Sequence, residues 1–248
     1  MKSIAISKKE YSLLNKYIGQ GRINASLVFF GNEPGTAALS IPDTLKFLEK
    51  IEKVPVDKGF LIETSYAKPT TSDFVRFISR LTLSLKHNDE RFVGDLTKQG
   101  EVFINEHICI PNQEKDICLI NLRPLPRPTQ DTWVYSNIND KDYLRKWNFM
   151  LKGHYSDNDK EERLKILETF FLNRTGLVIG VGEKENKKKF FEKIYPSIEF
   201  HKAHLDHHSI YFNIPQKIIL SDYFNNRNGI KVIGLLDLYR FITSRKIV

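Results

Sequence analysis

The segment after the first apolar run of the chain has the composition of a catalytic loop. Leu27-Val28-Phe29-Phe30 is followed directly by Gly31-Asn32-Glu33-Pro34-Gly35-Thr36. The glycines let the backbone turn tightly and approach a ligand closely, and Pro34 fixes one backbone dihedral. A glutamate held at the end of a buried strand can orient and activate a water molecule. Glu33 is therefore a candidate catalytic residue, and the alternative is an ordinary strand-to-helix turn with a solvated glutamate.

A second polar side chain ends another apolar run, Cys118-Leu119-Ile120-Asn121-Leu122-Arg123-Pro124. An asparagine offers one acceptor and two donors, which suits reading the Watson–Crick edge of an extruded base. Prolines stiffen the loop that follows, and Arg123 and Arg127 are expected to grip phosphates. The alternative is an asparagine that caps the strand before a connector.

Four short apolar runs, separated by helical patterns, must position these side chains. The expected strands are residues 27–30, 117–122, 176–181 and 218–220, and residues 209–214 also favour a strand. A capping box at Ser7 and Glu10 predicts a short helix near the start of the chain. Further helices are expected at about residues 72–86, 140–151, 159–173, 184–194 and 231–245. This order predicts a single domain, residues 1–248, built as a three-layer α/β/α sandwich around a mostly parallel four-stranded sheet.

Ligands of such sheets bind outside the carboxyl ends of the strands. The site is therefore expected where the strands end, at residues 31, 121, 182 and 221 onward. The first, second and fourth of these ends carry the residues on which the functional interpretation depends.

The charge of the chain favours a polyanionic partner. The formal net charge is +8 and the sequence pI is about 9.3, which favours encounters with nucleic acid, although a charge that only keeps the protein soluble is the alternative. The apolar runs are far shorter than the roughly 20 residues of a membrane span. Two cysteines, Cys109 and Cys118, do not suffice for a disulfide framework or a cysteine metal cluster. We expect a cytoplasmic monomer that does not associate with membranes.

The two loops together resemble motifs of the uracil-DNA glycosylase superfamily. Its first motif is a strand followed by G-x-[DNE]-P-[YG], which Phe30-Gly31-Asn32-Glu33-Pro34-Gly35 matches. Asn121-Leu122-Arg123-Pro124-Leu125 is similar to the N-L-C-P-L of the single-strand-selective branch. The resemblance implies a glycosylase fold in which Glu33 occupies the water-activating position and Asn121 binds the flipped base. It also implies that Asn32 lies among the catalytic groups and that the base is bordered by Gly31, Pro34 and Gly35.

The third motif departs from the family form. Where H-P-S usually ends the last core strand, the chain has Leu220-Ser221-Asp222-Tyr223-Phe224-Asn225-Asn226-Arg227-Asn228-Gly229. Ser221 or Asp222 would stand where the family often has histidine. The resemblance implies that this loop fills the stack vacated by the base, with Asn226 or Arg227 as the wedge and Tyr223 and Asn225 as further DNA contacts. The cysteines that hold an iron–sulfur cluster in several branches are absent, so no cofactor is expected.

Four histidines lie close together near the carboxyl end of the chain: His201, His204, His207 and His208. Their spacing permits a metal site, but no carboxylate cluster or cysteine pair supports one, and we expect no metal. We expect His208 to line the base pocket. Tyr66 is a candidate for stacking on the base.

These observations predict a monofunctional DNA glycosylase that flips out a modified base and excises it by hydrolysis. The long segment between Thr36 and the helix at about residue 72, with the altered third motif, motivates a bulky modified cytosine in phage DNA as target, and hence antiviral defence. Removal of uracil or another deaminated base is the nearest alternative. A non-catalytic nucleic-acid-binding module and a metal-dependent nuclease that uses the histidines are the alternatives from other classes.

Overall fold

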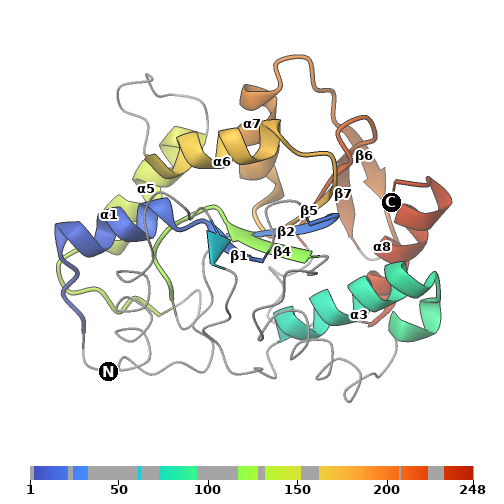
Figure 1. The fold of residues 1–248 in the computed structure, drawn as a ribbon, viewed down its shortest axis with the longest axis horizontal. Coiled ribbons are helices and arrows are strands. Elements are labelled where there is room, and N and C mark those ends of the chain that lie inside the picture. The colour runs from blue at the N-terminus through green and yellow to red at the C-terminus, as the bar shows by residue number, and fades with distance from the viewer. Residues whose placement is uncertain are drawn as a thin grey trace.

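Eight strands of the described chain form one sheet, which lies between two groups of helices (Figure 1). The computed structural model describes residues 3–21, 25–32, 61–62, 73–93, 117–127, 132–151, 162–206, 208–222 and 232–247. Across the sheet the order is β3-β1-β4-β2-β5-β8-β7-β6. The bounds of the strands are β1 (Gly19–Gly21), β2 (Leu27–Gly31), β3 (Leu61–Ile62), β4 (Ile117–Asn121), β5 (Leu177–Val181), β6 (His201–His204), β7 (Ser209–Asn213) and β8 (Ile218–Ser221).

The centre of this sheet consists of the four strands that the sequence predicts. β4, β2, β5 and β8 lie side by side and run parallel. The expectation of a four-stranded sheet is wrong, because β1 and β3 extend one edge and β7 and β6 extend the other. β7 confirms the strand expected at residues 209–214, whereas β1 and β6 are short and glycine-rich or polar. Such edge strands lack the continuous apolar run by which buried parallel strands are recognised.

Helices cover both faces of the sheet, as expected for an α/β/α arrangement. α1 (Lys8–Lys16), α5 (Asp140–Leu151), α6 (Glu162–Leu172) and α7 (Lys184–Ile194) pack on one face (Figure 1). α3 (Asp73–His87), the 3-10 helix η1 (Glu90–Val93) and α8 (Val232–Ser244) pack on the other. The capping box is present, because the Ser7 side chain accepts from the Glu10 backbone and the Glu10 carboxylate accepts from the Ser7 backbone.

The side chains of β2 serve both helical layers in alternation, and all five residues of the strand are buried. The ring of Phe30 lies 5.0 Å from that of Phe171 in α6 and 5.9 Å from that of Phe190 in α7. The ring of Phe29, on the opposite face, lies 6.1 Å from that of Phe77 in α3. The loop that begins at Gly31 therefore leaves from a strand that is held on both faces.

The order of the central strands identifies the place where a ligand is expected. Of the four central strands, β2 comes first in the chain. The next of them, β4, lies on one side of β2, and the third, β5, lies on the other side. The direction of winding thus reverses between β2 and β5, and open α/β sheets bind ligands outside the carboxyl ends of the strands at such a switch point. The residues that follow Phe30 and Val181 border this position.

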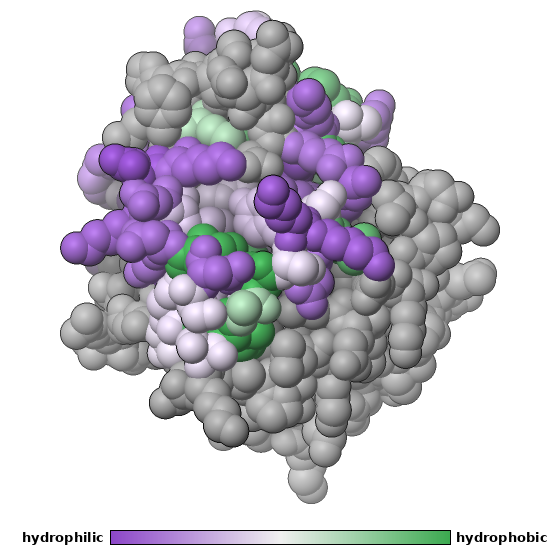
Figure 2. Space-filling model, turned by 90° about the vertical axis from the view of Figure 1, so that its left-hand side faces the viewer, coloured by the Kyte–Doolittle hydropathy of each residue, from purple (hydrophilic) through white to green (hydrophobic). Residues whose placement is uncertain are grey.

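Among the described residues, polar side chains predominate on the side of the molecule on which α1 and α5 lie. Figure 2 shows this side, where described hydrophilic residues surround a small apolar area. The two helices carry exposed basic side chains at Lys8, Lys9, Lys141, Arg145 and Lys146. Part of the basic charge therefore lies on folded helices. No helix in the described ranges has the length and apolar character that crossing a bilayer requires.

Candidate functional site

The two motif loops lie side by side at the carboxyl edge of the sheet. Gly31 and Asn121 are direct partners in the parallel pairing of β2 with β4. Beyond the strands, the Leu122 N–H donates to the Gly31 carbonyl at 3.0 Å, and the Arg123 N–H donates to the Asn32 carbonyl at 2.7 Å. The backbone therefore brings together the residues that the sequence analysis took from two distant segments.

Gly31 makes room for the side chain of Asn121. A Cβ atom built at position 31 would lie 2.8 Å from Asn121 Oδ1, which is too close for a larger residue. The Asn121 backbone is anchored, because its N–H donates to the Ile18 carbonyl at 2.9 Å. Within the described ranges its side-chain amide, with two donors and one acceptor, has no hydrogen-bond partner.

Arg163 of α6 holds the end of β4 in place, a role that the sequence analysis did not foresee. The side chain is fully buried, and its guanidinium donates to the carbonyl of Asn121 at 2.6 Å and to that of Leu122 at 3.0 Å. It also donates to the carbonyls of Leu14 at 2.9 Å and Tyr17. These acceptors belong to the end of α1, so one cation ties a helix terminus to the strand that carries Asn121.

The end of β5 completes the switch point with an unusual turn. Gly182 and Glu183 both have positive φ angles, 73° and 46°, and Glu183 is the N-cap of α7. For a residue with a side chain the left-handed conformation is uncommon and often marks a functional or otherwise constrained position. This strand end is the one to which the sequence analysis assigned no functional residue.

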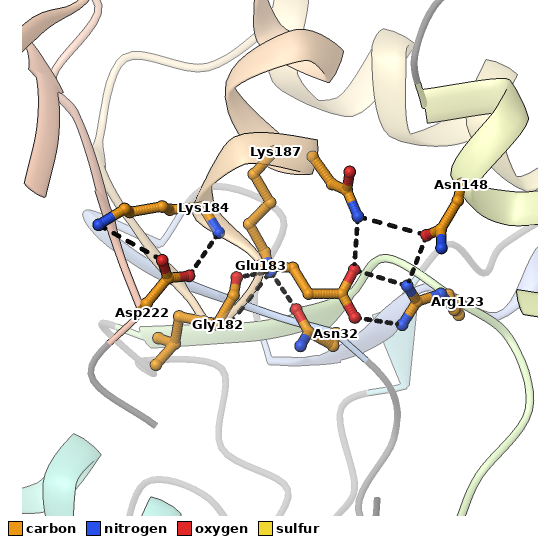
Figure 3. A network of polar contacts seen from close by, with 10 residues as sticks. Asn32, Arg123, Asn148, Gly182, Glu183, Lys184, Lys187 and Asp222 are labelled. Atoms are coloured by element: carbon orange, nitrogen blue, oxygen red, sulfur yellow. Dashed lines mark hydrogen bonds and ion pairs between the residues drawn. The ribbon is translucent and has the colours of Figure 1, made fainter. Parts of the chain in front are cut away.

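An internal ion pair joins this turn to the loop after β4 (Figure 3). The Arg123 guanidinium donates to both carboxylate oxygens of Glu183, at 2.7 and 2.5 Å, and to Asn148 Oδ1 at 3.3 Å. The Asn186 amide donates to Glu183 Oε2 at 2.9 Å and to Asn148 Oδ1 at 3.3 Å. Only 2% of the Arg123 side chain is exposed. Arg123 is thus engaged in a bidentate internal ion pair, and its expected contact with a phosphate stays a prediction.

The ion pair sets the ionisation of Glu183. Burial acts to raise the pKa of Glu183, but the Arg123 charge and hydrogen bond, the Asn186 hydrogen bond and the Lys187 charge together lower it below its ordinary value of 4.5. The unfolded chain consequently binds a proton here at higher pH than the folded chain does. The pair stabilises the fold above about pH 4.5, and this stabilisation is lost as the pH falls through the folded pKa.

Glu183→Gln should therefore lower the free energy of unfolding near neutral pH and make little difference in acid. Urea unfolding at about pH 7 and about pH 4 measures this, and the gap between wild type and variant should narrow at the lower pH. Glu199→Gln, at an exposed position before β6, is the matched control. A gap that is equal at both pH values would contradict the assigned role.

Lys187 of α7 reaches across the switch point to the loop after β2 (Figure 3). Its ammonium donates to Asn32 Oδ1, to the Gly182 carbonyl at 2.5 Å and to the Val181 carbonyl at 3.1 Å. The side chain is fully buried, and Gly180 leaves space for it, since a Cβ there would lie 3.1 Å from Lys187 Cδ. Lys187 therefore connects the ends of β2 and β5.

The end of β8 anchors the start of α7. Asp222 accepts from the Lys184 backbone N–H at 2.8 Å and lies 3.3 Å from the Lys184 ammonium. The carboxylate thus caps a helix whose own N-cap side chain makes no capping bond. Ser221 is buried in the sheet, and its carbonyl accepts from the Gly182 N–H at 2.7 Å. The expected catalytic residues Ser221 and Asp222 lie one strand beyond the switch point, on the far side of β5, and both contact the β5–α7 turn.

The remaining expected residues divide into two groups. Arg127 is 8% exposed and lies 3.9 Å from Asp140, so it too is mostly internal. His208 is half-buried directly before β7, whose first residues pair with the end of β8. The others lie outside the described residues: Glu33, Pro34, Gly35, Tyr66, Tyr223, Asn225, Asn226 and Arg227.

Metal and thiol chemistry find no support in the described part of the chain. Among those residues, no three histidine, cysteine or acidic side chains are grouped so as to hold a metal ion. His201 and His204 are exposed on β6. Cys118 is fully buried in β4, and burial raises the pKa of its thiol to about 12. Because the thiolate is the reactive form, Cys118 is not a nucleophile at neutral pH.

Arg163, Glu183 and Lys187 were not predicted as site residues from the sequence, and a local signal was present for Glu183 alone. Gly180-Val181-Gly182-Glu183 ends an apolar strand with a glycine and an acid, as Gly31-Asn32-Glu33 does. The lysine-rich helix that follows is typical of a solvated surface, so nothing local distinguishes the buried Lys187 from its neighbours. Arg163 binds backbone carbonyls, which leave no trace in the pattern of side chains.

Comparison of the chain with protein-family models, with curated proteins and with solved structures finds no match.

Proposed function

We propose that the chain is a monofunctional DNA glycosylase that hydrolyses the bond between a flipped base and its deoxyribose. The observation that carries this proposal is the pairing of Gly31 with Asn121 at the carboxyl edge of the sheet, directly beside the switch point between β2 and β5. It sets the Asn121 amide, which has no hydrogen-bond partner among the described residues, beside the strand end that leads to Asn32, and Glu33 follows Asn32 directly in the chain. An amide that reads the base and a carboxylate that activates water are the minimum equipment for hydrolytic base removal.

In the proposed reaction, Asn121 hydrogen-bonds the extruded base and Glu33 aims a water molecule at the anomeric carbon. The carbon–nitrogen bond breaks with both electrons going to the base, and the sugar becomes oxocarbenium-like. Water then adds to the sugar and Glu33 takes its proton, while the base leaves as an anion that is protonated afterwards. Hydrogen-bond donors near the departing base stabilise its negative charge.

The environment of Lys187 supports hydrolysis over amine-mediated chemistry. A lysine that forms a Schiff base must present a free lone pair, whereas an ammonium has three donors and no acceptor. Three oxygen atoms surround the Lys187 nitrogen, which favours the ammonium form. Lys187 is therefore a poor candidate for a Schiff-base nucleophile, which fits the proposed hydrolytic reaction.

The substrate within this class is proposed from the sequence alone. The long segment after Thr36 and the altered third motif favour a bulky modified cytosine, as in phage DNA, and a role in antiviral defence. Uracil or another deaminated base is the alternative substrate.

A duplex labelled on the target strand tests the proposal directly. The panel should contain cytosine, 5-hydroxymethylcytosine, glucosylated hydroxymethylcytosine, uracil and hypoxanthine, each with and without a chelator. Abasic sites that break only after alkali treatment support the proposal. Chelator-sensitive nicks would indicate a nuclease, and retardation of DNA without base release would indicate a binding module.

Asn121→Ala should reduce the single-turnover rate of base release by about 10- to 100-fold, because one base-reading side chain contributes about 1–3 kcal/mol. Affinity for DNA without the target base should change little. Base release and gel retardation on matched duplexes measure the two effects. Equal losses on target and non-target DNA would instead make Asn121 a structural residue.

A further inference from the structure

The ammonium of Lys187 determines which way the amide of Asn32 faces. An ammonium only donates hydrogen bonds, so the side-chain oxygen of Asn32, and not its nitrogen, must face Lys187. The amide nitrogen is then directed away from Lys187, as Figure 3 shows. In the described ranges this nitrogen has no hydrogen-bond partner. Asn32 is therefore held as a donor at the switch point.

The burial of Lys187 makes this orientation strong. The side chain is fully buried, and its nitrogen lies 5.3 Å from the centre of the Phe30 ring. Charge is poorly screened in such surroundings, so the ammonium polarises the amide to which it is bonded. A polarised amide is a better donor through its nitrogen. The same contact thus fixes and strengthens the donor that Asn32 presents.

We propose that Lys187 is a positioning residue that holds Asn32 as a hydrogen-bond donor to the departing base. This inference rests on the proposed glycosylase function and names the chemistry of that site more closely. The ligand atom is an acceptor on the base, a carbonyl oxygen or ring nitrogen on which negative charge accumulates as the glycosidic bond breaks. Asn32 donates to this atom, and Lys187 remains protonated throughout.

The hydrogen bond between Lys187 and Asn32 gives Asn32 and Asn121 different roles. The Asn121 amide has no hydrogen-bond partner within the part of the chain that the structure describes, and an amide with two donors and an acceptor can read a base edge of either kind. Asn32 presents donors alone, because its oxygen is occupied by Lys187. The two amides lie on neighbouring strand ends, since β2 pairs with β4 at Gly31 and Asn121. The site thus combines recognition of the base with stabilisation of its developing charge.

A purely structural role for Lys187 makes a different prediction. A cation that only ties α7 to the ends of β2 and β5 would affect stability and would slow release of every base equally. A donor to a developing anion matters most for bases that are poor leaving groups. The dependence of the rate on the leaving group therefore separates the two roles.

The test uses the full chain with four variants: Asn32→Ala, Asn32→Asp, Lys187→Met and the double variant Lys187→Met/Asn32→Ala. Asn32→Asp keeps an oxygen partner for the buried ammonium but removes the donor, so it remains informative if Lys187→Met folds poorly. Lys165→Met, at an exposed position on α6, is the control. Single-turnover base release is measured on the preferred target base and on a counterpart with an electron-withdrawing ring substituent, together with urea unfolding.

We expect Asn32→Ala and Asn32→Asp to slow release of the unactivated base on the order of 100-fold, as is usual when one donor to a developing anion is lost. Asn32→Asp should retain the wild-type unfolding midpoint. Lys187→Met should cost on the order of 10-fold, as expected when a partner that orients a functional group is lost. Both losses should be clearly smaller for the activated base. Lys187→Met should add little to Asn32→Ala, because it acts through Asn32.

Three results would overturn the inference while leaving the proposed function intact: wild-type release by Asn32→Ala, equal losses on both bases, or additive effects of the two substitutions. In each case the wild type and Lys165→Met still release the base. If the wild type releases no base from any duplex of the panel, both the inference and the proposed function fail.

Discussion

Glu33→Gln should abolish most base release, with a loss of about 100- to 10,000-fold in the single-turnover rate, because it removes the proposed general base. The change replaces a carboxylate with an amide of nearly the same shape. Glu33 follows Asn32, whose carbonyl accepts from the Arg123 N–H and whose side chain binds Lys187. The residue before the substitution is therefore anchored, and we expect fold and DNA affinity to be unchanged.

Base release by Glu33→Gln is measured on the panel duplex, with gel retardation and urea unfolding on the same preparation. Asn121→Ala provides the contrast, since it should lose recognition of the target base rather than water activation. A Glu33→Gln variant that turns over at the wild-type rate would refute the catalytic role of Glu33.

Arg163→Met should cost on the order of 3–5 kcal/mol of folding free energy, a large part of the 5–15 kcal/mol that is usual for a domain. The substitution leaves buried carbonyls at the end of α1 and the end of β4 without their donor. Burial lowers the pKa of Arg163 to about 10, so the side chain is still charged at neutral pH. Urea unfolding measures the loss.

Arg163→Lys should fall between the wild type and Arg163→Met, because an ammonium has three donors and lacks the planar fork of a guanidinium. Arg145→Met is the control, since Arg145 is 81% exposed and pairs only with Asp142 among the contacts described for it. Exposed pairs of this kind contribute about 0–1 kcal/mol. A loss of less than about 1 kcal/mol in Arg163→Met would show that water or neighbouring groups satisfy the carbonyls.

The apolar runs of the chain predicted its central architecture correctly. Residues 27–30, 117–122, 176–181 and 218–220 correspond to β2, β4, β5 and β8. A strand that is buried on both faces needs an uninterrupted apolar run, and such a run can be recognised from a few consecutive residues. The same holds for α3, α5, α6, α7 and α8, whose apolar spacing matches the helical repeat. The edge strands β1, β3 and β6 have no such requirement, and the sequence did not reveal them.

The candidate site was predictable as far as it depends on strand ends. Parallel strands bring their carboxyl ends to one edge, so the proximity of Gly31 and Asn121 follows once both strands are recognised. The ion pair of Arg123 with Glu183 could not be predicted in this way, because a basic residue in a proline-rich loop is typical of a phosphate contact. Its partner Glu183 lies 60 residues further along the chain.

The sequence by itself determined the parallel strands, the helices between them and the polar residues that follow β2 and β4, because these features are local patterns of burial and turn formation. Only the tertiary structure decided the strand order and hence the switch point between β2 and β5. It also decided that Lys187 binds Asn32, 155 residues away, and that Arg163 binds carbonyls of α1 and β4. Ion pairs and buried hydrogen bonds form between specific atoms of residues that are distant in the sequence. The spacing of residue types along the chain does not indicate which of those atoms come into contact.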